Sequence, residues 1–163
     1  MKTLYLVRHA KSSWKYPDLD DFERPLNKRG RKNAPLMGKL LKKLNVNPDI
    51  IVSSPANRAA TTARMLAAKI NYPLENIQYS EILYEFSEGA LIQILKRIDD
   101  CVAKAMIVGH NPGLNNMANY LGNRQISNIP TAGVYCLDLN IASWTKIGQN
   151  CGKSIFFEFP KKH

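Results

Sequence analysis

The sequence predicts an α/β domain built around a largely parallel β-sheet. Short apolar runs, typical of buried strands, alternate along the chain with longer segments that have helical periodicity. The length of 163 residues suits one compact core. No linker, repeat or low-complexity segment divides the chain, so we expect residues 1–163 to form a single domain.

The expected strands are short and apolar, and the first one leads directly into Arg8 and His9. A strand near residues 77–79 has the weakest pattern. The other strands are expected at residues 3–7, 50–53, 104–108, 134–139 and 154–159.

Four amphipathic stretches separate these strands. In the first, apolar residues recur at i, i+3, i+4 and i+7 from Met37 to Leu44, and lysines occupy the opposite face. Pro35 must lie near the start of this helix or kink it. The other helices are expected at residues 58–68, 88–98 and 115–121.

The composition is that of an ordinary globular protein, with 45% hydrophobic and 22% charged residues. No apolar run approaches the ~18 residues that span a bilayer, and the apolar run before Arg8 is too short for a signal peptide. Cys101, Cys136 and Cys151 are odd in number and widely spaced, which fits neither a disulfide framework nor a Cys-x-x-Cys site. We therefore expect reduced thiols, a cytoplasmic protein and no membrane association.

The net charge of +10 favours anionic partners such as phosphates, acidic proteins or nucleic acid. Much of this charge is expected on the solvent side of helices. There is neither zinc-finger spacing nor an aromatic RNP run, so a nucleic-acid partner is not expected.

Three of the predicted strands end in residues that carry chemistry. Arg8 and His9 follow the first strand, Arg58 lies shortly after the second, and His110 follows the strand that ends at Val108. In open parallel sheets ligands bind outside the carboxyl ends of the strands, so these residues should converge. Guanidinium groups grip phosphoryl oxygens two at a time. A neutral imidazole is a competent nucleophile for phosphorus, and a second one, if protonated, adds positive charge.

Each of these residues also has an ordinary explanation. An Arg-His pair after a strand can be surface decoration, Gly109-His110 can be a turn, and Arg58 can cap or salt-bridge its helix. The three strand ends together favour a shared site.

The motifs resemble those of the histidine phosphatase superfamily, which includes the cofactor-dependent phosphoglycerate mutases. Residues 7–12 are similar to its Arg-His-Gly signature, with Ala10 in place of the usual glycine. Residues 53–63, with Ser53-Ser54-Pro55 followed by Arg58, resemble the second signature, and residues 108–111 the third. The short length, and Glu23-Arg24-Pro25-Leu26 followed by Gly30, resemble the small SixA-type phosphohistidine phosphatases.

The resemblance implies a phosphoglycerate mutase-like three-layer sandwich, with helices on both faces of a mostly parallel sheet that contains one antiparallel strand. It implies that His9 is the nucleophile and that Arg8, Arg58 and His110 hold the phosphoryl group. Alanine at position 10 should be tolerated unless the backbone there needs a positive φ. Glu85 is the candidate proton donor, and a surface carboxylate capping the next helix is the alternative.

Lys11 and Ser12 could extend the phosphate cradle. The loop with Asp18, Asp20 and Asp21 is interpreted as a solvated acidic turn, and we expect neither a metal nor a cofactor.

The expected reaction transfers a phosphoryl group to His9 and then to water, releasing inorganic phosphate. A short chain with little room for enclosing insertions favours a phosphohistidine-bearing protein as substrate. A small phosphorylated metabolite is the alternative within the same family. A phosphoprotein- or RNA-binding module without turnover is the alternative from another class.

Overall fold

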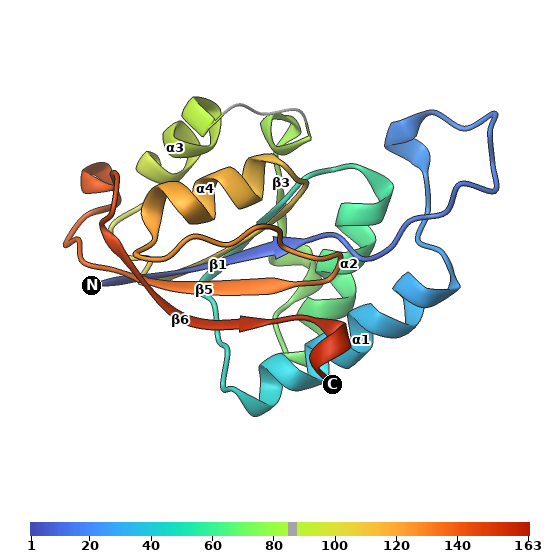
Figure 1. Cartoon of the computed structure of the whole chain (residues 1–163), viewed down its shortest axis with the longest axis horizontal. Coiled ribbons are helices and arrows are strands. Elements are labelled where there is room, and N and C mark those ends of the chain that lie inside the picture. Colours follow the sequence, from blue (N-terminus) through green and yellow to red (C-terminus); the bar gives the residue numbers. More distant parts are fainter. Residues whose placement is uncertain (85–87) are drawn as a thin grey trace.

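The structure is a computed structural model that describes residues 1–84 and 88–163. Its centre is a six-stranded sheet with the order β3-β2-β4-β1-β5-β6 (Figure 1). The strands are β1 (Lys2–Arg8), β2 (Ile50–Ser53), β3 (Gln78–Tyr79), β4 (Lys104–Gly109), β5 (Val134–Leu139) and β6 (Gly152–Glu158).

Strands β3, β2, β4 and β1 are parallel to one another. β5 is antiparallel to both of its neighbours, β1 and β6. One strand thus runs against the rest, and β6 has the same direction as β1.

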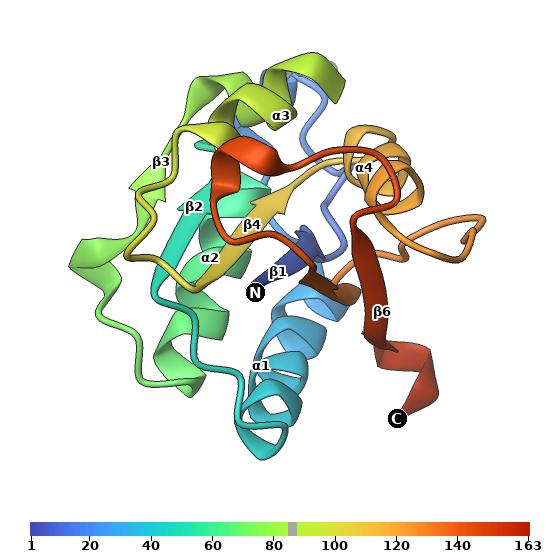
Figure 2. The same cartoon turned by 90° about the vertical axis from the view of Figure 1, so that its left-hand side faces the viewer.

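Helices cover both faces of the sheet (Figures 1 and 2). The helices are α1 (Lys28–Lys43), α2 (Asn57–Lys69), α3 (Glu88–Lys96) and α4 (Gly113–Leu121). Because side chains alternate along a strand, Leu4 and Leu6 of β1 pack with α3 and α4. Tyr5 and Val7 pack with α1 and α2 on the opposite face. The predicted three-layer α/β sandwich is therefore confirmed.

The predicted strands and helices all occur; most of their ends shift by a few residues, but the first helix begins at Lys28, well before the apolar pattern that starts at Met37. The third helix ends at Lys96, two residues early, and the fourth begins at Gly113, two residues early. Pro35 lies inside α1, which begins at Lys28 and continues through it. Leu44, the last residue of the predicted apolar face, is the C-cap and is 42% exposed.

The parallel strands bring three chain segments to one edge of the sheet. Arg8 pairs with Gly109 across β1 and β4, and Ser53 pairs with Val108 across β2 and β4. The residues that follow these strands therefore leave the sheet side by side.

The start of α1 packs directly on the segment after β1. Asn27 caps the helix, its side-chain oxygen accepting from the Gly30 N–H at 2.8 Å. A Cβ at Gly30 would lie 2.1 Å from the carbonyl oxygen of Lys11, so only glycine fits this contact.

Within the described residues, no helix is both long enough and apolar enough to cross a membrane.

Candidate active site

His9 directly follows β1 and has a fixed tautomer. Its Nδ1 lies 2.7 Å from the carbonyl oxygen of Ala10. A carbonyl oxygen only accepts hydrogen bonds, so Nδ1 carries the proton and Nε2 keeps its lone pair. The Ala10 N–H is in turn held at 2.9 Å by the hydroxyl of Thr62 from α2. Ala10 is not among the residues with positive φ, so alanine replaces glycine there without backbone strain.

The surroundings of His9 favour its neutral form. The side chain is buried, and this burial is the main cause that lowers the pKa of His9 to about 3. The nearby His110, Arg58 and Arg8 lower this pKa further. At neutral pH the imidazole is therefore uncharged and its Nε2 is available to attack phosphorus.

His110 follows β4 and lies beside His9. The two ring centroids are 5.1 Å apart. Nε2 of His110 is 2.8 Å from the hydroxyl oxygen of Ser54, which follows β2. Burial, followed by Arg58, lowers the pKa of His110 to about 4. The second imidazole is thus neutral at neutral pH in the free protein, although the nearby Asp21 carboxylate partly opposes this lowering of its pKa.

Arg8 is the last residue of β1. Its Nη1 donates to the carbonyl oxygen of Ile129 at 3.0 Å. Its Nε is buried and has no hydrogen-bond partner among the described residues. Arg8 therefore has a donor that an anion could satisfy.

Arg58 lies in the first turn of α2 and is buried. Its Nη1 donates to the backbone oxygen of Asp21 at 2.6 Å, and its Nη2 contacts the Asp21 carboxylate at 2.9 Å. Arg58 thus lies at the predicted site. It also forms the salt bridge that was the alternative explanation for an arginine at this position.

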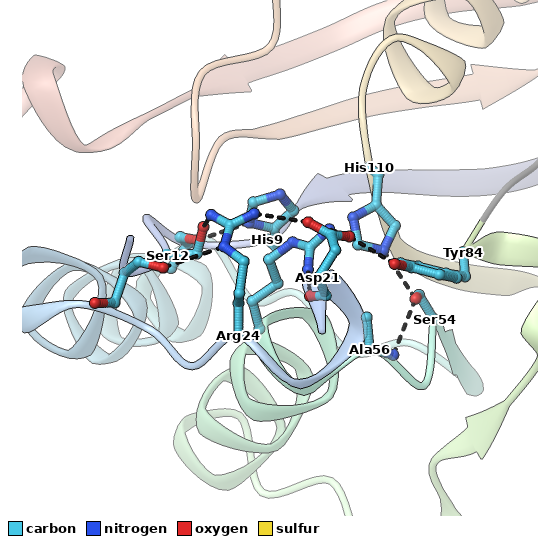
Figure 3. Close-up of polar contacts among 11 residues, drawn as sticks. His9, Ser12, Asp21, Arg24, Ser54, Ala56, Tyr84 and His110 are labelled. Atoms are coloured by element: carbon cyan, nitrogen blue, oxygen red, sulfur yellow. Dashed lines mark hydrogen bonds and ion pairs between the residues drawn. The ribbon is translucent and has the colours of Figure 1, made fainter. Parts of the chain in front are cut away.

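Asp21 is the centre of a polar cluster, as Figure 3 shows. Its carboxylate accepts from the Tyr84 hydroxyl at 2.6 Å, from Arg24 at 2.8 Å and from Arg58 at 2.9 Å. The hydrogen bond from Tyr84 is the main cause that lowers the pKa of Asp21. The interpretation as a solvated turn fits Asp18, Asp20 and Asp21, which are all exposed, but the Asp21 carboxylate also binds three side chains of the site.

Arg24 connects this cluster to the segment after His9. Its guanidinium donates to the hydroxyl of Ser12 and, through Nε, to the backbone oxygen of Ser13 at 3.1 Å. Its Cζ lies 3.4 Å from the ring centroid of Trp14. The hydroxyl of Ser12 is therefore held by Arg24.

A small cavity lies over His9. Its volume is about 190 Å³. Four further predicted site residues line it, namely Arg8, Lys11, Ser12 and Arg58, together with Trp14, Arg24 and Thr131. His110 is not part of this lining and joins the group through its ring contact with His9. Glu85 lies outside the described residues.

Sequence reasoning missed several residues of the site. Arg24 belongs to a quoted motif, but nothing in the sequence assigned it a partner. Asp21 begins one short 3₁₀ helix, Tyr84 caps the end of another, and Thr62 lies on α2. The spacing of Asp21 and Arg24, one helical turn apart, was the available signal for their ion pair.

No group of three or more histidine, cysteine or acidic residues in residues 1–84 and 88–163 is arranged to hold a metal ion. Cys101, Cys136 and Cys151 are all free.

Comparisons with known proteins identify the family and the fold. Residues 4–100 match the sequence model of the histidine phosphatase superfamily (branch 1). An uncharacterized protein of Mycobacterium tuberculosis is 30% identical over 166 residues, which cover 95% of this chain and 100% of the relative. A crystal structure from Agrobacterium tumefaciens that carries the name SixA is 27% identical, with a TM-score of 0.81 and 98% of each chain covered. A structure of the protein histidine phosphatase SixA with tungstate is 19% identical, with a TM-score of 0.84 and 98% of each chain covered.

Proposed function

We propose that this chain, which belongs to the histidine phosphatase superfamily, hydrolyses phosphohistidine on a protein through a phosphorylated His9. Membership of the superfamily, together with the likeness to the SixA structure of Agrobacterium tumefaciens, supports a phosphatase. The single observation that carries the mechanism is the hydrogen bond from His9 Nδ1 to the carbonyl oxygen of Ala10. This bond directs the lone pair of Nε2 away from the backbone and fixes the ring for attack.

In the first step, Nε2 of His9 forms a bond to phosphorus as the bond from phosphorus to the substrate nitrogen breaks. Arg8 and Arg58 neutralise the phosphoryl oxygens, and His110 donates a hydrogen bond. The departing imidazole takes a proton from solvent. Imidazole leaves more readily than an alkoxide, so the need for a dedicated acid such as Glu85 is smaller.

In the second step, water attacks phospho-His9. The bond from phosphorus to Nε2 breaks, the proton of water passes to solvent, and inorganic phosphate leaves. The protein makes little covalent chemistry here, so positioning and charge stabilisation dominate both steps. Arg8 and Arg58 supply this charge without a metal, and His110 adds a hydrogen-bond donor.

A protein substrate is favoured by the shape of the surface at the cavity. The cavity of about 190 Å³ has room for a phosphoryl group and a small ring, so the rest of a substrate would lie on the surface outside it. The loop beside it exposes large apolar side chains, with Trp14 75% and Tyr16 54% accessible. Such side chains suit contact with another protein. We place the reaction in the cytoplasm, where the three free cysteines would stay reduced.

The test compares a histidine-phosphorylated protein with a chromogenic aryl phosphate and common sugar phosphates. We expect the highest kcat/KM on the phosphohistidine protein and an acid-labile phosphoryl label on the wild type after rapid quenching. The His9→Ala variant should fold normally and lack both turnover and label.

A His9→Ala protein with substantial activity would refute the covalent step. A sugar phosphate turned over faster than the phosphohistidine protein would replace the proposed substrate class with a small metabolite.

A further inference from the structure

A second, larger depression lies beside the cavity over His9. Its volume is about 680 Å³. We call it the basic groove and define it by six of its lining residues: Arg8, Lys11, Arg29, Lys32, Phe159 and Lys161. It shares Arg8, Lys11 and Thr131 with the cavity over His9, so the two are continuous.

The charged side chains that line the groove are all positive. Its lining includes five lysine and arginine side chains and no aspartate or glutamate. Within residues 1–84 and 88–163, none of Lys11, Arg29 and Lys32 has a carboxylate within 4 Å, and the same holds for Lys161. The field of these cations is therefore not cancelled locally.

Segments far apart in the sequence build the walls. Arg29 and Lys32 come from the first turns of α1, and Asn128 to Thr131 from the loop before β5. Phe159 and Lys161 follow β6, which shares the direction of β1 and so ends at the same edge of the sheet as His9. Glu158, the last residue of β6, contacts Lys162 at 3.6 Å and His163 at 2.6 Å.

We propose that the basic groove binds an acidic segment of the substrate protein. This segment flanks the phosphorylated residue that the substrate presents to His9. This inference rests on the proposed function and extends it to the flanking sequence of the substrate. The cations are distributed over separate walls of a depression more than three times the volume of the cavity over His9. This spread suits several carboxylates along an extended chain better than one compact group. Complementary charge of this kind raises the encounter rate and selects partners.

The experiment uses two histidine-phosphorylated peptides of equal length, one with flanking Asp and Glu and one with Asn and Gln at those positions. The groove variant is Arg29→Gln with Lys32→Gln. The matched control is Lys42→Gln with Lys43→Gln, which removes the same charge from exposed positions at the other end of α1.

We expect the wild type and the control to prefer the acidic peptide by roughly tenfold in kcat/KM, within the range of electrostatic steering. The groove variant should lose this preference and keep the wild-type rate on an aryl phosphate. The preference should also shrink as salt is raised, because these charges are solvent-exposed.

Equal turnover of the two peptides by the wild type overturns the proposal. An equal loss of preference for the acidic peptide in the Lys42→Gln, Lys43→Gln control also overturns it, because the effect would then depend on net charge and not on the groove. If the Arg29 and Lys32 substitutions lower kcat/KM only for a small bisphosphorylated molecule, the ligand of the groove is a second phosphate group and not an acidic segment.

A readout independent of phosphohistidine turnover separates this inference from the proposed function. The unphosphorylated acidic peptide should inhibit aryl phosphate hydrolysis by the wild type and the control, and inhibit the groove variant roughly tenfold more weakly. If that inhibition is seen while phosphohistidine is not hydrolysed, the groove binds acidic peptides as proposed, and phosphohistidine is not the substrate. If phosphohistidine is hydrolysed without such inhibition, the groove fails alone.

Discussion

At the residue scale, one carboxylate and the expected phosphoryl group compete for the same guanidinium. Asp21 occupies two donors of Arg58 through its backbone and side-chain oxygens. Tyr84 and Arg24 also bind this carboxylate, so it stays ionised and poorly suited to donate a proton. Asp21 thus orients Arg58, and a bound phosphoryl group would use the donors that remain or displace the carboxylate.

The Arg58→Lys variant should lose ~100–1,000-fold in turnover, a loss comparable to removing a preorganised donor. Lysine keeps the charge but lacks the planar fork that grips two oxygens. The measurement is kcat on an aryl phosphate together with the binding of vanadate, which mimics the phosphoryl transition state.

The matched control is Asp21→Asn, which breaks the ion pair and keeps Arg58. If Arg58 only pairs with Asp21, both variants should have the same small defect. Near wild-type turnover in Arg58→Lys would remove this residue from the proposed clamp.

Acid should destabilise the protein through its two buried histidines. Their pKa values are lowered in the folded state, to about 3 for His9 and about 4 for His110. Between these values and the ordinary pKa near 6.5, the unfolded state binds more protons. The free energy of unfolding should therefore fall as pH drops from about 6.5 towards 4, by up to ~1.4 kcal/mol per pH unit for each histidine.

Urea unfolding at several pH values from 7 to 4.5 measures this slope. Replacing His9 with Gln should reduce the slope of the free energy of unfolding against pH by up to ~1.4 kcal/mol per pH unit, the contribution of one proton. A pH-independent stability in the wild type would contradict the burial-driven shift of both imidazoles.

At the scale of secondary-structure elements, one hydroxyl joins α2 to the end of β1. The Thr62 Oγ1 donates to the backbone oxygen of Arg58 at 2.7 Å and accepts from the Ala10 N–H at 2.9 Å. Ala10 in turn accepts from His9. The helix that carries Arg58 and the residue that orients His9 are therefore fixed relative to each other.

The Thr62→Val variant should lower the free energy of unfolding by ~1–3 kcal/mol, because the buried Ala10 N–H loses its partner. Turnover should fall as well, since the carbonyl of Ala10 orients His9. The Thr62→Ser variant keeps the hydroxyl and serves as the control in denaturant unfolding and kinetics. Equal stability and turnover of the Val and Ser variants would mean that the hydrogen bond between the Thr62 hydroxyl and the Ala10 N–H does not position His9.

The elements of this fold were largely predictable, because buried strands and amphipathic helices have strong local patterns. The convergence of Arg8, His9 and His110 also follows from the pairing of parallel strands. The role of Asp21 was not predictable, because its partners Tyr84 and Arg58 lie 63 and 37 residues away along the chain. A loop between β1 and α1 has no periodicity that would indicate which face of the site it contacts.

At the scale of the whole molecule, positive charge from side chains surrounds the site. The net charge is +10, and Arg8, Arg24 and Arg58 all line the cavity over His9. In the proposed mechanism, these groups would supply the charge stabilisation that divalent cations supply in other phosphoryl-transfer enzymes.

Exhaustive chelation should therefore leave the hydrolysis of an aryl phosphate unchanged. A metal-dependent phosphatase treated in the same way serves as the control for effective chelation. Activity that is lost and then restored by a divalent cation would contradict a metal-free mechanism.

The common direction of β1 and β6 has a practical consequence for handling the protein. Met1 precedes the start of β1, whereas His163 follows the segment that forms a wall of the basic groove (Figure 1). An affinity tag, a fluorophore or a surface linkage attached after His163 would emerge next to that wall. The same attachment before Met1 would leave from the opposite end of β1, so immobilisation through the amino terminus keeps both the cavity over His9 and the groove open to a protein in solution.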